Sequence, residues 1–463
     1  MTSVAIVLSL LVPVFIGFSV VRICIPGGRD LCRHDWLRLS LGVGTGFGIC
    51  SCTLFVWLLT FGRVHVLYIG IEAGLVVLLG ALAAWSAKRC CLCVSTAVPN
   101  TALAGWKHPL LAVFAVAGLA ACLSFALESR IHPDGQGDAW AIWNLKARFL
   151  FSGGAQWRTV FSKALFWSHP DYPLLLPGAV ARGWIYTGTE TQAVPIGIAM
   201  LFTFGTVGVL TTGLTALGES EKGLIAGTVL AGTGSFVKLG AAQYADVPIA
   251  FFFLASILLL CMRDRIPMSG MLLAGVSAAL AAWSKNEGLL FLLLLAIALK
   301  WARQPLAGVS AGAFCILVLP AIFKLTLAPP NYLAASGMSA VLRNGTDPSR
   351  YLLIAVGFVW QLMTFGGHGI NPLIPIFATL FLLKTREKPG ARTAAIVLAG
   401  MCVGDSLAYL ITPFDLGWQI SRSLDRLLLQ LWPTALLAYF CIVEFPIVPA
   451  STLSPAVPLS VSS

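Results

Sequence analysis

The chain has 463 residues, of which 58% are hydrophobic and only 11% are charged. A soluble globule of this length needs more polar surface, so the composition excludes a water-soluble domain and indicates an integral membrane protein. The net charge of +11 would suit nucleic acid, but the 30 Lys and Arg residues are scattered without a dense run. We therefore expect no nucleic-acid partner, and membrane orientation explains the basic loops better.

Continuous apolar stretches predict helices as the spanning element, because lipid requires a backbone whose hydrogen bonds are satisfied internally. We predict an all-α polytopic membrane protein with about 13 transmembrane helices. The predicted spans are 3–21, 39–61, 65–86, 109–127, 192–216, 223–238, 246–262, 268–283, 288–301, 306–326, 369–384, 393–411 and 427–444. The segment 351–363 is expected to lie in the interface, since counting it as a crossing would reverse the basic loop 384–392.

The distribution of basic residues predicts the orientation. Residues 1–21 carry no Lys or Arg and basic residues follow them, which is the reverse of a signal peptide, so we expect a retained first helix with its N-terminus outside. Alternation then places Arg263, Arg265 and the loop 384–392 in the cytoplasm; only the slightly acidic loop 219–222 dissents. The long segment 128–190 falls outside, and its mixture of aromatic and basic residues predicts interfacial helices or a simple aromatic belt.

Cysteine and glycine patterns predict no chemistry. The twelve cysteines lie in predicted spans or on the cytoplasmic side, so no disulfide framework is expected. The cluster Cys90–Cys93 could bind metal or accept a lipid, but it lacks a second ligand pair, and unspecialised thiols are favoured. Gly232-Thr233-Gly234 lies inside a predicted span, where we expect it to serve helix packing.

Two aspartates stand at the start of the long outer segment. Asp134 and Asp138 are four residues apart, so they could share one face of a short helix and perturb each other's proton affinity. One of them could act as a base, although Asp138 could equally cap the aromatic helix that follows it. Asp246, which precedes Val247-Pro248, has the same alternative as a cap.

Further polar groups lie at the ends of other spans. His169 and Asp171 belong to a loop that two prolines restrict, which suits substrate positioning or a plain turn. Lys285 and Glu287 interrupt an apolar stretch and must lie at the membrane surface or in a polar cavity. Arg422 and Arg426 are one helical turn apart, so they could hold an anionic group together, or could pair with Asp415 or Asp425.

Five motifs taken in order resemble one family. They are Asp138-Ala-Trp-Ala-Ile-Trp-Asn-Leu-Lys-Ala-Arg-Phe-Leu-Phe151, Ser168-His-Pro-Asp-Tyr-Pro-Leu-Leu175, Tyr244-Ala-Asp-Val-Pro-Ile-Ala-Phe-Phe252, Ser284-Lys-Asn-Glu-Gly288 and Asp415-Leu-Gly-Trp-Gln-Ile-Ser-Arg-Ser-Leu-Asp-Arg-Leu-Leu-Leu-Gln-Leu-Trp-Pro433. Together they look like the bacterial membrane glycosyltransferases of the C-type (GT-C) superfamily, which are similar to the protein O-mannosyltransferases and the lipid A aminoarabinose transferases. The resemblance covers residues 109–440.

This resemblance implies a polyprenyl-phosphate-linked sugar donor and an inverting transfer on the outer face of a bacterial plasma membrane. It gives the role of base to Asp138, with Asp134 as second choice, and an acceptor or metal-organising role to Asp246 beside Tyr244. It divides the chain into an N-terminal three-helix extension (1–107), a catalytic core (108–445) and a flexible tail (446–463). Two departures stand out: the three extra spans, and Gln419 where relatives often carry histidine.

The chemistry of such a transfer suits the polar residues. A carboxylate would take the proton of the acceptor hydroxyl, and the leaving phosphate would need cations, which Lys146, Arg148, Lys285, Arg422 and Arg426 could supply. A divalent metal ion could share that task, although no ligand cluster requires one. The acceptor could be a lipid, a glycan or a protein. The competing class is a multispan transporter or channel, in which intramembrane charges line a pathway.

Overall fold

The computed structural model describes residues 2–26, 34–89, 107–331, 337–367, 371–386 and 390–445. The predicted Cys90–Cys93 cluster and the predicted tail 446–463 lie outside these residues.

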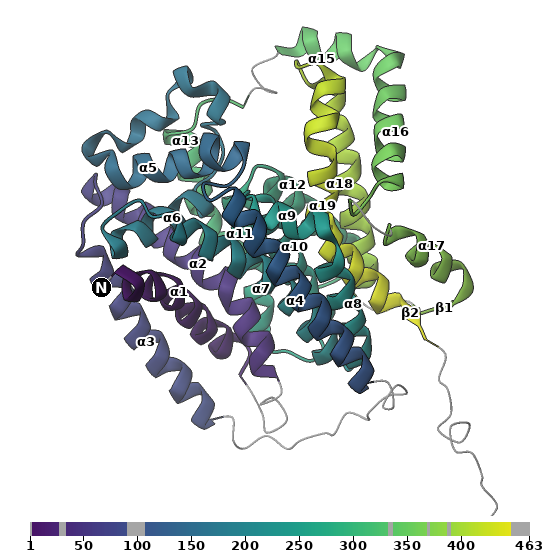
Figure 1. Cartoon of the computed structure of the whole chain (residues 1–463), viewed down its shortest axis with the longest axis horizontal. Coiled ribbons are helices and arrows are strands. Elements are labelled where there is room, and N and C mark those ends of the chain that lie inside the picture. The colour runs from purple at the N-terminus through teal and green to yellow at the C-terminus, as the bar shows by residue number, and fades with distance from the viewer. Residues whose placement is uncertain are drawn as a thin grey trace, which may run out of the picture.

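The described chain is nearly all helical (Figure 1). The helices of its first half are α1 (Thr2–Cys24), α2 (Asp35–Phe61), α3 (Tyr68–Arg89), α4 (Lys107–Ile131), η4 (Ala139–Trp143, a π-helix), α5 (Asn144–Ser152), η5 (Gly154–Phe161) and η6 (Lys163–Ser168), both 3-10 helices, α6 (Leu175–Thr187), α7 (Ala193–Ala216) and α8 (Ser220–Gly232). The second half contains α9 (Gly234–Ala241), α10 (Asp246–Cys261), α11 (Met268–Ser284), α12 (Glu287–Trp301), α13 (Ala307–Thr326), α15 (Gly337–Gly345), α16 (Pro348–Met363), α17 (Leu373–Leu382), α18 (Ala391–Ile411) and α19 (Leu416–Ile442). Two short strands, β1 (Lys384–Thr385) and β2 (Val443–Glu444), pair antiparallel.

Each predicted span overlaps a helix, but the count of thirteen spans is not confirmed. In the described part of the chain, seven helices are long and apolar enough to cross a membrane: α1, α2, α3, α4, α7, α13 and α18. The pair α8 and α9 makes an eighth if it counts as one bent span. Helices α10 and α11 have 16 and 17 residues, fewer than the ~20 that a bilayer core requires. The architecture is that expected of an all-α membrane protein.

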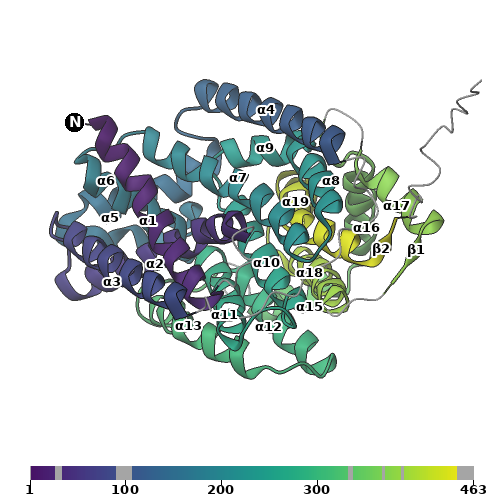
Figure 2. The same ribbon diagram turned by 90° about the horizontal axis from the view of Figure 1, so that it is seen from below.

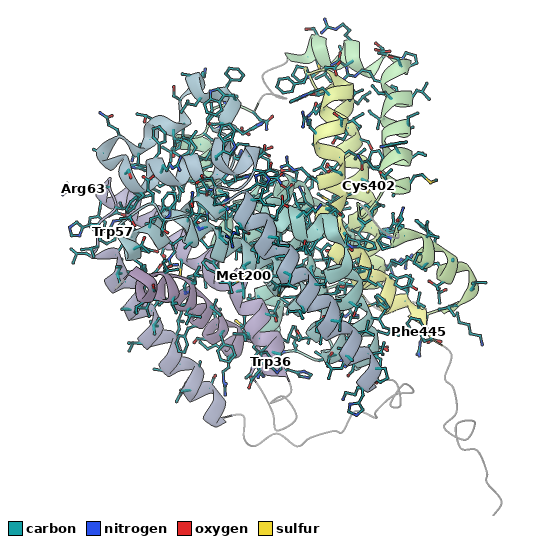
Figure 3. All side chains as sticks on the ribbon, viewed as in Figure 1. Trp36, Trp57, Arg63, Met200, Cys402 and Phe445 are labelled. Atoms are coloured by element: carbon teal, nitrogen blue, oxygen red, sulfur yellow. The ribbon has the colours of Figure 1, made fainter. Side chains whose placement is uncertain are left out.

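The outer surface of the molecule is apolar, as a lipid-facing surface must be. In the most apolar 18-residue stretch of α3, and likewise in that of α4, only 11% is buried inside the protein. Large exposed hydrophobic side chains such as Trp36 and Met200 project from the surface (Figure 3). Apolar exposure on this scale would make a soluble monomer aggregate, so lipid is its natural environment.

The predicted span 223–238 is broken at Thr233, which corrects the interpretation of its glycines. Helices α8 and α9 meet at 63°, and Thr233 between them has an extended backbone. A Cβ atom on Gly232 or Gly234 would meet no other atom within 4 Å, so these glycines do not serve close packing. The Thr233 hydroxyl instead donates to the Val229 carbonyl and accepts from the Trp432 indole, which holds the bend.

Helix α10 forms the centre of the molecule. Its residues from Asp246 to Leu260 are buried without exception, and it packs against α7, α11 and α19, which surround it in the view from below (Figure 2). A helix that is apolar on every side is stable only when protein or lipid encloses it completely. Here protein does so, and α10 can carry a polar group at its N-terminus into the interior.

The first two helices pack into this core. A Cβ atom on Gly17 would overlap the carbonyl of Gly42, and one on Gly46 would overlap the carbonyl of Pro13, so the α1 and α2 backbones touch. Helix α2 also packs against α6 and α7. The division at residue 107 stays a prediction from the sequence.

A buried ion pair joins α3 to α6. The Arg182 guanidinium donates to both carboxylate oxygens of Glu72, at 2.7 and 2.6 Å, and neither side chain is exposed. The Tyr186 hydroxyl also donates to Glu72, and Arg182 donates to the carbonyl of Ser9 in α1. Bidentate pairing and these added hydrogen bonds offset the cost of removing both charges from water.

The segment predicted to lie in the interface forms α16, which runs along other helices. Figure 1 shows α16 beside the upper halves of α18 and α19. The Arg350 guanidinium donates to the carbonyls of Tyr409, Leu410 and Thr412 at the end of α18. Helix α17 follows and leads to β1, which pairs with β2 beyond the far end of α19. Together α16 and α17 lead the chain from one end of the helical bundle to the other.

The Glu72–Arg182 pair provides a test of this packing. Replacing Glu72 by Leu leaves a buried guanidinium without its counter-ion, and we expect a loss of about 3–5 kcal/mol in stability. The double variant Glu72→Leu/Arg182→Met removes both charges and should recover most of that loss. Thermal unfolding of the purified protein in detergent measures both, and a single variant as stable as the parent would contradict the description.

Candidate functional site

A cavity of about 1440 Å³ opens where the long segment after α4 meets the C-terminal helices. Its wall comes from the segments 136–142 and 163–172, from α9, from the junction of α11 and α12, and from α18 and α19. The titratable residues that line it are Asp138, Lys163, His169, Asp171, Tyr172, Lys238, Tyr244, Asp246, Lys285, Glu287, Asp405, Tyr409, Arg422, Asp425 and Arg426. Its volume exceeds the roughly 300–1,000 Å³ of an ordinary small-molecule site, so it has room for a large ligand.

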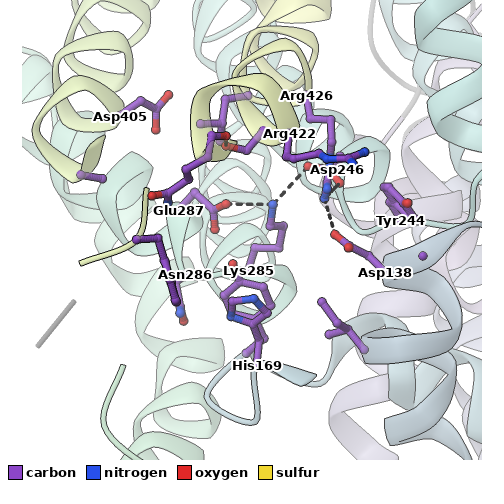
Figure 4. Close-up of a pocket in the computed structure, with 18 of the residues that line it drawn as sticks. Asp138, His169, Tyr244, Asp246, Lys285, Asn286, Glu287, Asp405, Arg422 and Arg426 are labelled. Carbon is purple, nitrogen blue, oxygen red and sulfur yellow. Dashed lines mark hydrogen bonds and ion pairs between the residues drawn. The ribbon is translucent and has the colours of Figure 1, made fainter. Parts of the chain in front are cut away.

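Arg426 of α19 joins two acidic residues from distant segments. Its Nη2 atom lies 2.7 Å from an Asp138 carboxylate oxygen and 2.9 Å from an Asp246 carboxylate oxygen. The guanidinium carbon lies 4.5 Å from the centre of the Tyr244 ring. Figure 4 shows the arginine above both carboxylates. Its Nε atom is buried and has no hydrogen-bond partner among the described residues, so the guanidinium can still donate.

Side chains from three other segments engage both oxygens of the Asp246 carboxylate. One carboxylate oxygen accepts from Lys285 at 3.1 Å and from Gln430 at 2.6 Å, while the other accepts from Arg426. The side chain is fully buried, and Asp246 is the first residue of α10, with Ala245 at the N-cap position. Its carboxylate therefore holds Lys285, Gln430 and Arg426 together at the start of the central helix.

Lys285 continues this chain of alternating charges. Its ammonium lies 3.1 Å from Asp246 and 2.8 Å from Glu287 Oε1, and its extended backbone separates α11 from α12. The second oxygen of Glu287, Oε2, is buried without a hydrogen bond to any described residue. Of the two settings predicted for this pair, the structure shows the polar cavity.

The two aspartates of the outer segment occupy different positions. The Asp138 side chain is 33% exposed, faces the cavity and makes no capping hydrogen bond to η4. Asp134 is exposed and does not line the cavity. Asp138 is therefore the acidic residue of this pair that a bound molecule can reach.

The turn between α9 and α10 holds Asp138 in place. The Gln243 side chain donates to the carbonyl of Pro133 and accepts from the side chain of Asn144. Gln243 itself has a left-handed backbone, with φ of 62°. The amide of Gln136 also donates to the carbonyl of Ala242. These bonds fix residues 133–138 against the turn that carries Tyr244 and Asp246.

His169 belongs to a stack of three rings. The Tyr172 ring lies between His169, at 4.8 Å, and Trp143, at 5.5 Å, with nearly parallel planes. Burial lowers the pKa of His169, so its imidazole is neutral at physiological pH. Asp171 beside it is buried and accepts from Asn286 at 2.7 Å and from Asn331 at 2.9 Å. The loop is therefore a rigid part of the cavity wall.

Lys146 and Arg148, predicted to neutralise a phosphate, do not line the cavity. The Lys146 amine is completely buried and donates to the carbonyls of His169, at 2.6 Å, and Tyr172, at 3.2 Å. Arg148 lies 3.2 Å from Glu190, in the same outer segment. Lys146 therefore supports the backbone of the His169 loop, and its amine lies 5.8 Å from the Trp143 ring centre and 5.7 Å from that of Tyr172. Trp143 is likewise buried, so the aromatic residues here are more than a surface belt.

Arg422 lines the cavity and is exposed, with no side-chain ion pair to any other described residue. It pairs with neither Asp415 nor Asp425; Asp415 instead caps α19 by accepting from the amide of Trp418. Arg422 thus faces the cavity as an available cation, as Lys238 on α9 does.

Several residues of the cavity were not predicted. Asp405 lies within a predicted apolar span, and Asn286 stands inside the Ser284–Glu287 motif. Gln430, also within a predicted span, does not line the cavity but donates to Asp246. A polar side chain within a span is itself a signal of function or of buried pairing, and that signal could have identified Asp405.

No family model, curated protein or solved structure matches this chain. The described residues contain no group of three or more His, Cys, Asp and Glu side chains arranged to hold a metal ion. Asp246, to which the resemblance gives a metal-organising role, shares Arg426 with Asp138 and also accepts from Lys285 and Gln430. A divalent metal ion therefore stays a prediction from the sequence.

The buried amine of Lys146 makes stability depend on pH. Burial lowers its pKa from 10.5 to about 7, so between these values the unfolded chain binds a proton that the folded chain does not. Stability should therefore rise as the pH increases through this window. Lys146→Met should abolish the rise, whereas Lys163→Met, at an exposed position, should keep it. Melting temperatures measured across the window check this, and an unchanged slope in Lys146→Met would refute it.

Proposed function

We propose that the protein transfers a sugar from a polyprenyl-phosphate-linked donor to an acceptor hydroxyl, with inversion, on the extracytoplasmic face of a bacterial plasma membrane. The observation that carries the proposal is the triad of Asp138, Arg426 and Asp246. It combines a reachable carboxylate, a guanidinium with an unused donor and a buried fixed charge in one large cavity. The resemblance to GT-C glycosyltransferases, based on the ordered motifs, assigns these same acids to the reaction.

In this proposal Asp138 is the general base. The acceptor oxygen attacks the anomeric carbon and forms the new glycosidic bond, its proton passes to the Asp138 carboxylate, and the bond from the anomeric carbon to the phosphate oxygen breaks. The leaving lipid phosphate keeps the electron pair. Asp138 suits this role better than Asp246 because it is partly exposed and has an acceptor oxygen to spare.

The phosphate would bind at the cationic side of the same cavity. Arg426 offers its unused Nε donor, and Arg422 lies one helical turn away with no ion pair in the described part of the chain. As a phosphate draws the guanidinium toward itself, the hold of Arg426 on Asp138 weakens and the carboxylate becomes more basic. Donor binding would thereby activate the base.

Removing the base tests the proposal directly. Asp138→Asn keeps the shape of the side chain but cannot accept a proton, and we expect transfer to fall by about 10²–10⁴-fold. Asp264→Asn, an exposed site next to Arg263, is the matched control and should leave transfer unchanged. The assay follows radiolabelled sugar from bacterial membrane lipids into envelope acceptors. Full activity in a folded Asp138→Asn protein would refute the assignment.

The bridging arginine provides a second test. Arg426→Lys keeps one positive charge, but an ammonium cannot reproduce the planar fork that contacts two carboxylates and a phosphate. We expect transfer to fall by about 10²-fold, with lipid-donor KM raised. Arg422→Lys should lose less, because Arg422 has no carboxylate to orient. Equal losses in both variants would show that charge alone is required.

One observation favours a transporter as the second candidate. Helix α9 follows a 63° break and lines the cavity, and broken helices of this kind surround the substrate sites of many secondary transporters. Proteoliposomes separate the two functions. A transporter would move an unmodified polar solute across the bilayer in both wild-type and Asp138→Asn protein, whereas a transferase would move none and would need Asp138.

A further inference from the structure

One end of the cavity holds a carboxylate that the proposed reaction does not use. Asp405 of α18 is only 7% exposed, and it lines the cavity. No described residue makes a side-chain hydrogen bond or ion pair with it. It also lies within an apolar helix long enough to cross a membrane. An ionisable residue in such a helix is costly and usually serves a function.

Helix packing places this carboxylate at the cavity. A Cβ atom on Gly404 would lie 2.3 Å from the Leu290 side chain, and one on Gly400 would lie 2.7 Å from Leu294. The two glycines therefore let α18 approach α12 closely. Asp405 follows Gly404 directly, and α12 begins at Glu287, so the two acids belong to the same region.

The charges already present do not satisfy Asp405. Glu287 and Lys285 are the charged groups that act on it electrostatically. Lys285 is committed to Asp246 and to Glu287 Oε1, whereas Glu287 Oε2 has no hydrogen-bond partner among the described residues. Figure 4 shows Asp405 and Glu287 on one side of Lys285, with Asp246, Tyr244 and Asp138 on the other. This end of the cavity therefore offers acceptor oxygens of two acids that no described side chain uses.

A bound cation would pair with the Asp405 carboxylate. An ammonium group has three donors and a full positive charge, so it can neutralise Asp405 and also donate to a neighbouring acceptor. A hydroxyl donates once and leaves the charge uncompensated. The unused oxygen of Glu287 would then accept from a hydroxyl or amine of the same molecule.

We propose that the Asp405 end of the cavity binds a primary ammonium group of the substrate, with Asp405 as its counter-ion and Glu287 Oε2 as a further acceptor. This proposal rests on the proposed transferase function, to which it adds that a substrate of the reaction carries a primary amine. The amine can come from an amino sugar or from a phosphoethanolamine headgroup. Both sources share the chemistry that the cavity recognises.

The test is a binding measurement on the purified full-length protein in detergent. The probes are glucosamine, O-phosphoethanolamine, N-acetylglucosamine and glucose, and the readout is tryptophan fluorescence, since Trp418 lines the cavity. We expect at least one of the two amines to bind about tenfold or more tightly than the two neutral sugars. Which of the two amines binds identifies the source. Equal binding of all four probes, or none, would overturn the proposal.

Variants then locate the site. Asp405→Asn should reduce amine binding by about tenfold or more, and Asp264→Asn should not change it. If Asp405→Asn does not fold, Glu287→Gln and the preference of wild-type protein for amines over the acetylated sugar decide the matter. Amine binding unaffected by both cavity variants would overturn the assignment.

Asp138→Asn separates this proposal from the proposed function. It should bind the amine normally while it loses transfer. A protein that transfers sugar but shows no amine preference refutes only the ammonium site. Conversely, amine binding in a protein without transfer refutes only the transferase.

Discussion

The cavity depends on one arginine that neutralises two acids at once. Arg426 comes from α19, Asp246 from the start of the central helix, and Asp138 from the long segment after α4. Lys285 then extends the alternation of charges to Glu287. A charge buried without a partner destabilises a protein by several kcal/mol, so none of these groups can be buried until the others are present. The formation of these ion pairs and the packing of the four segments that carry them are therefore cooperative.

Hydrophobic patterning was enough to predict where helices lie, but not how many of them cross a membrane. Lipid and protein interior select the same apolar residues, so α10 and the lipid-facing α4 look alike in sequence although their surroundings are opposite. Helices α8 and α9 looked continuous because Thr233 is compatible with a helix, and its break depends on a hydrogen bond from Trp432 far along the chain. For the same reason the sequence did not show that Arg350 anchors α16 to carbonyl groups of a distant helix end.

The candidate site was predicted where its residues interrupt apolar sequence conspicuously. Asp138, Asp246, Lys285 and Arg426 all stand at the ends of predicted spans, and the structure brings them together. The sequence alone could not decide whether each acid caps a helix or faces a cavity, because both roles place the acid just before a helix. Lys146 seemed equivalent to the other basic residues, since sequence does not show that its amine faces backbone carbonyls. Asp405 was missed because a single acid in an otherwise apolar span was counted as part of the span.

The position of Lys146 has a consequence for its chemistry. A neutral amine is a good nucleophile, and burial makes this one largely neutral at physiological pH, yet the folded protein shields it completely. It therefore combines high intrinsic reactivity with no access. A small acylating reagent could reach this amine only when the ring stack of Trp143, Tyr172 and His169 moves away. The rate of acylation would therefore report how often this part of the cavity wall opens.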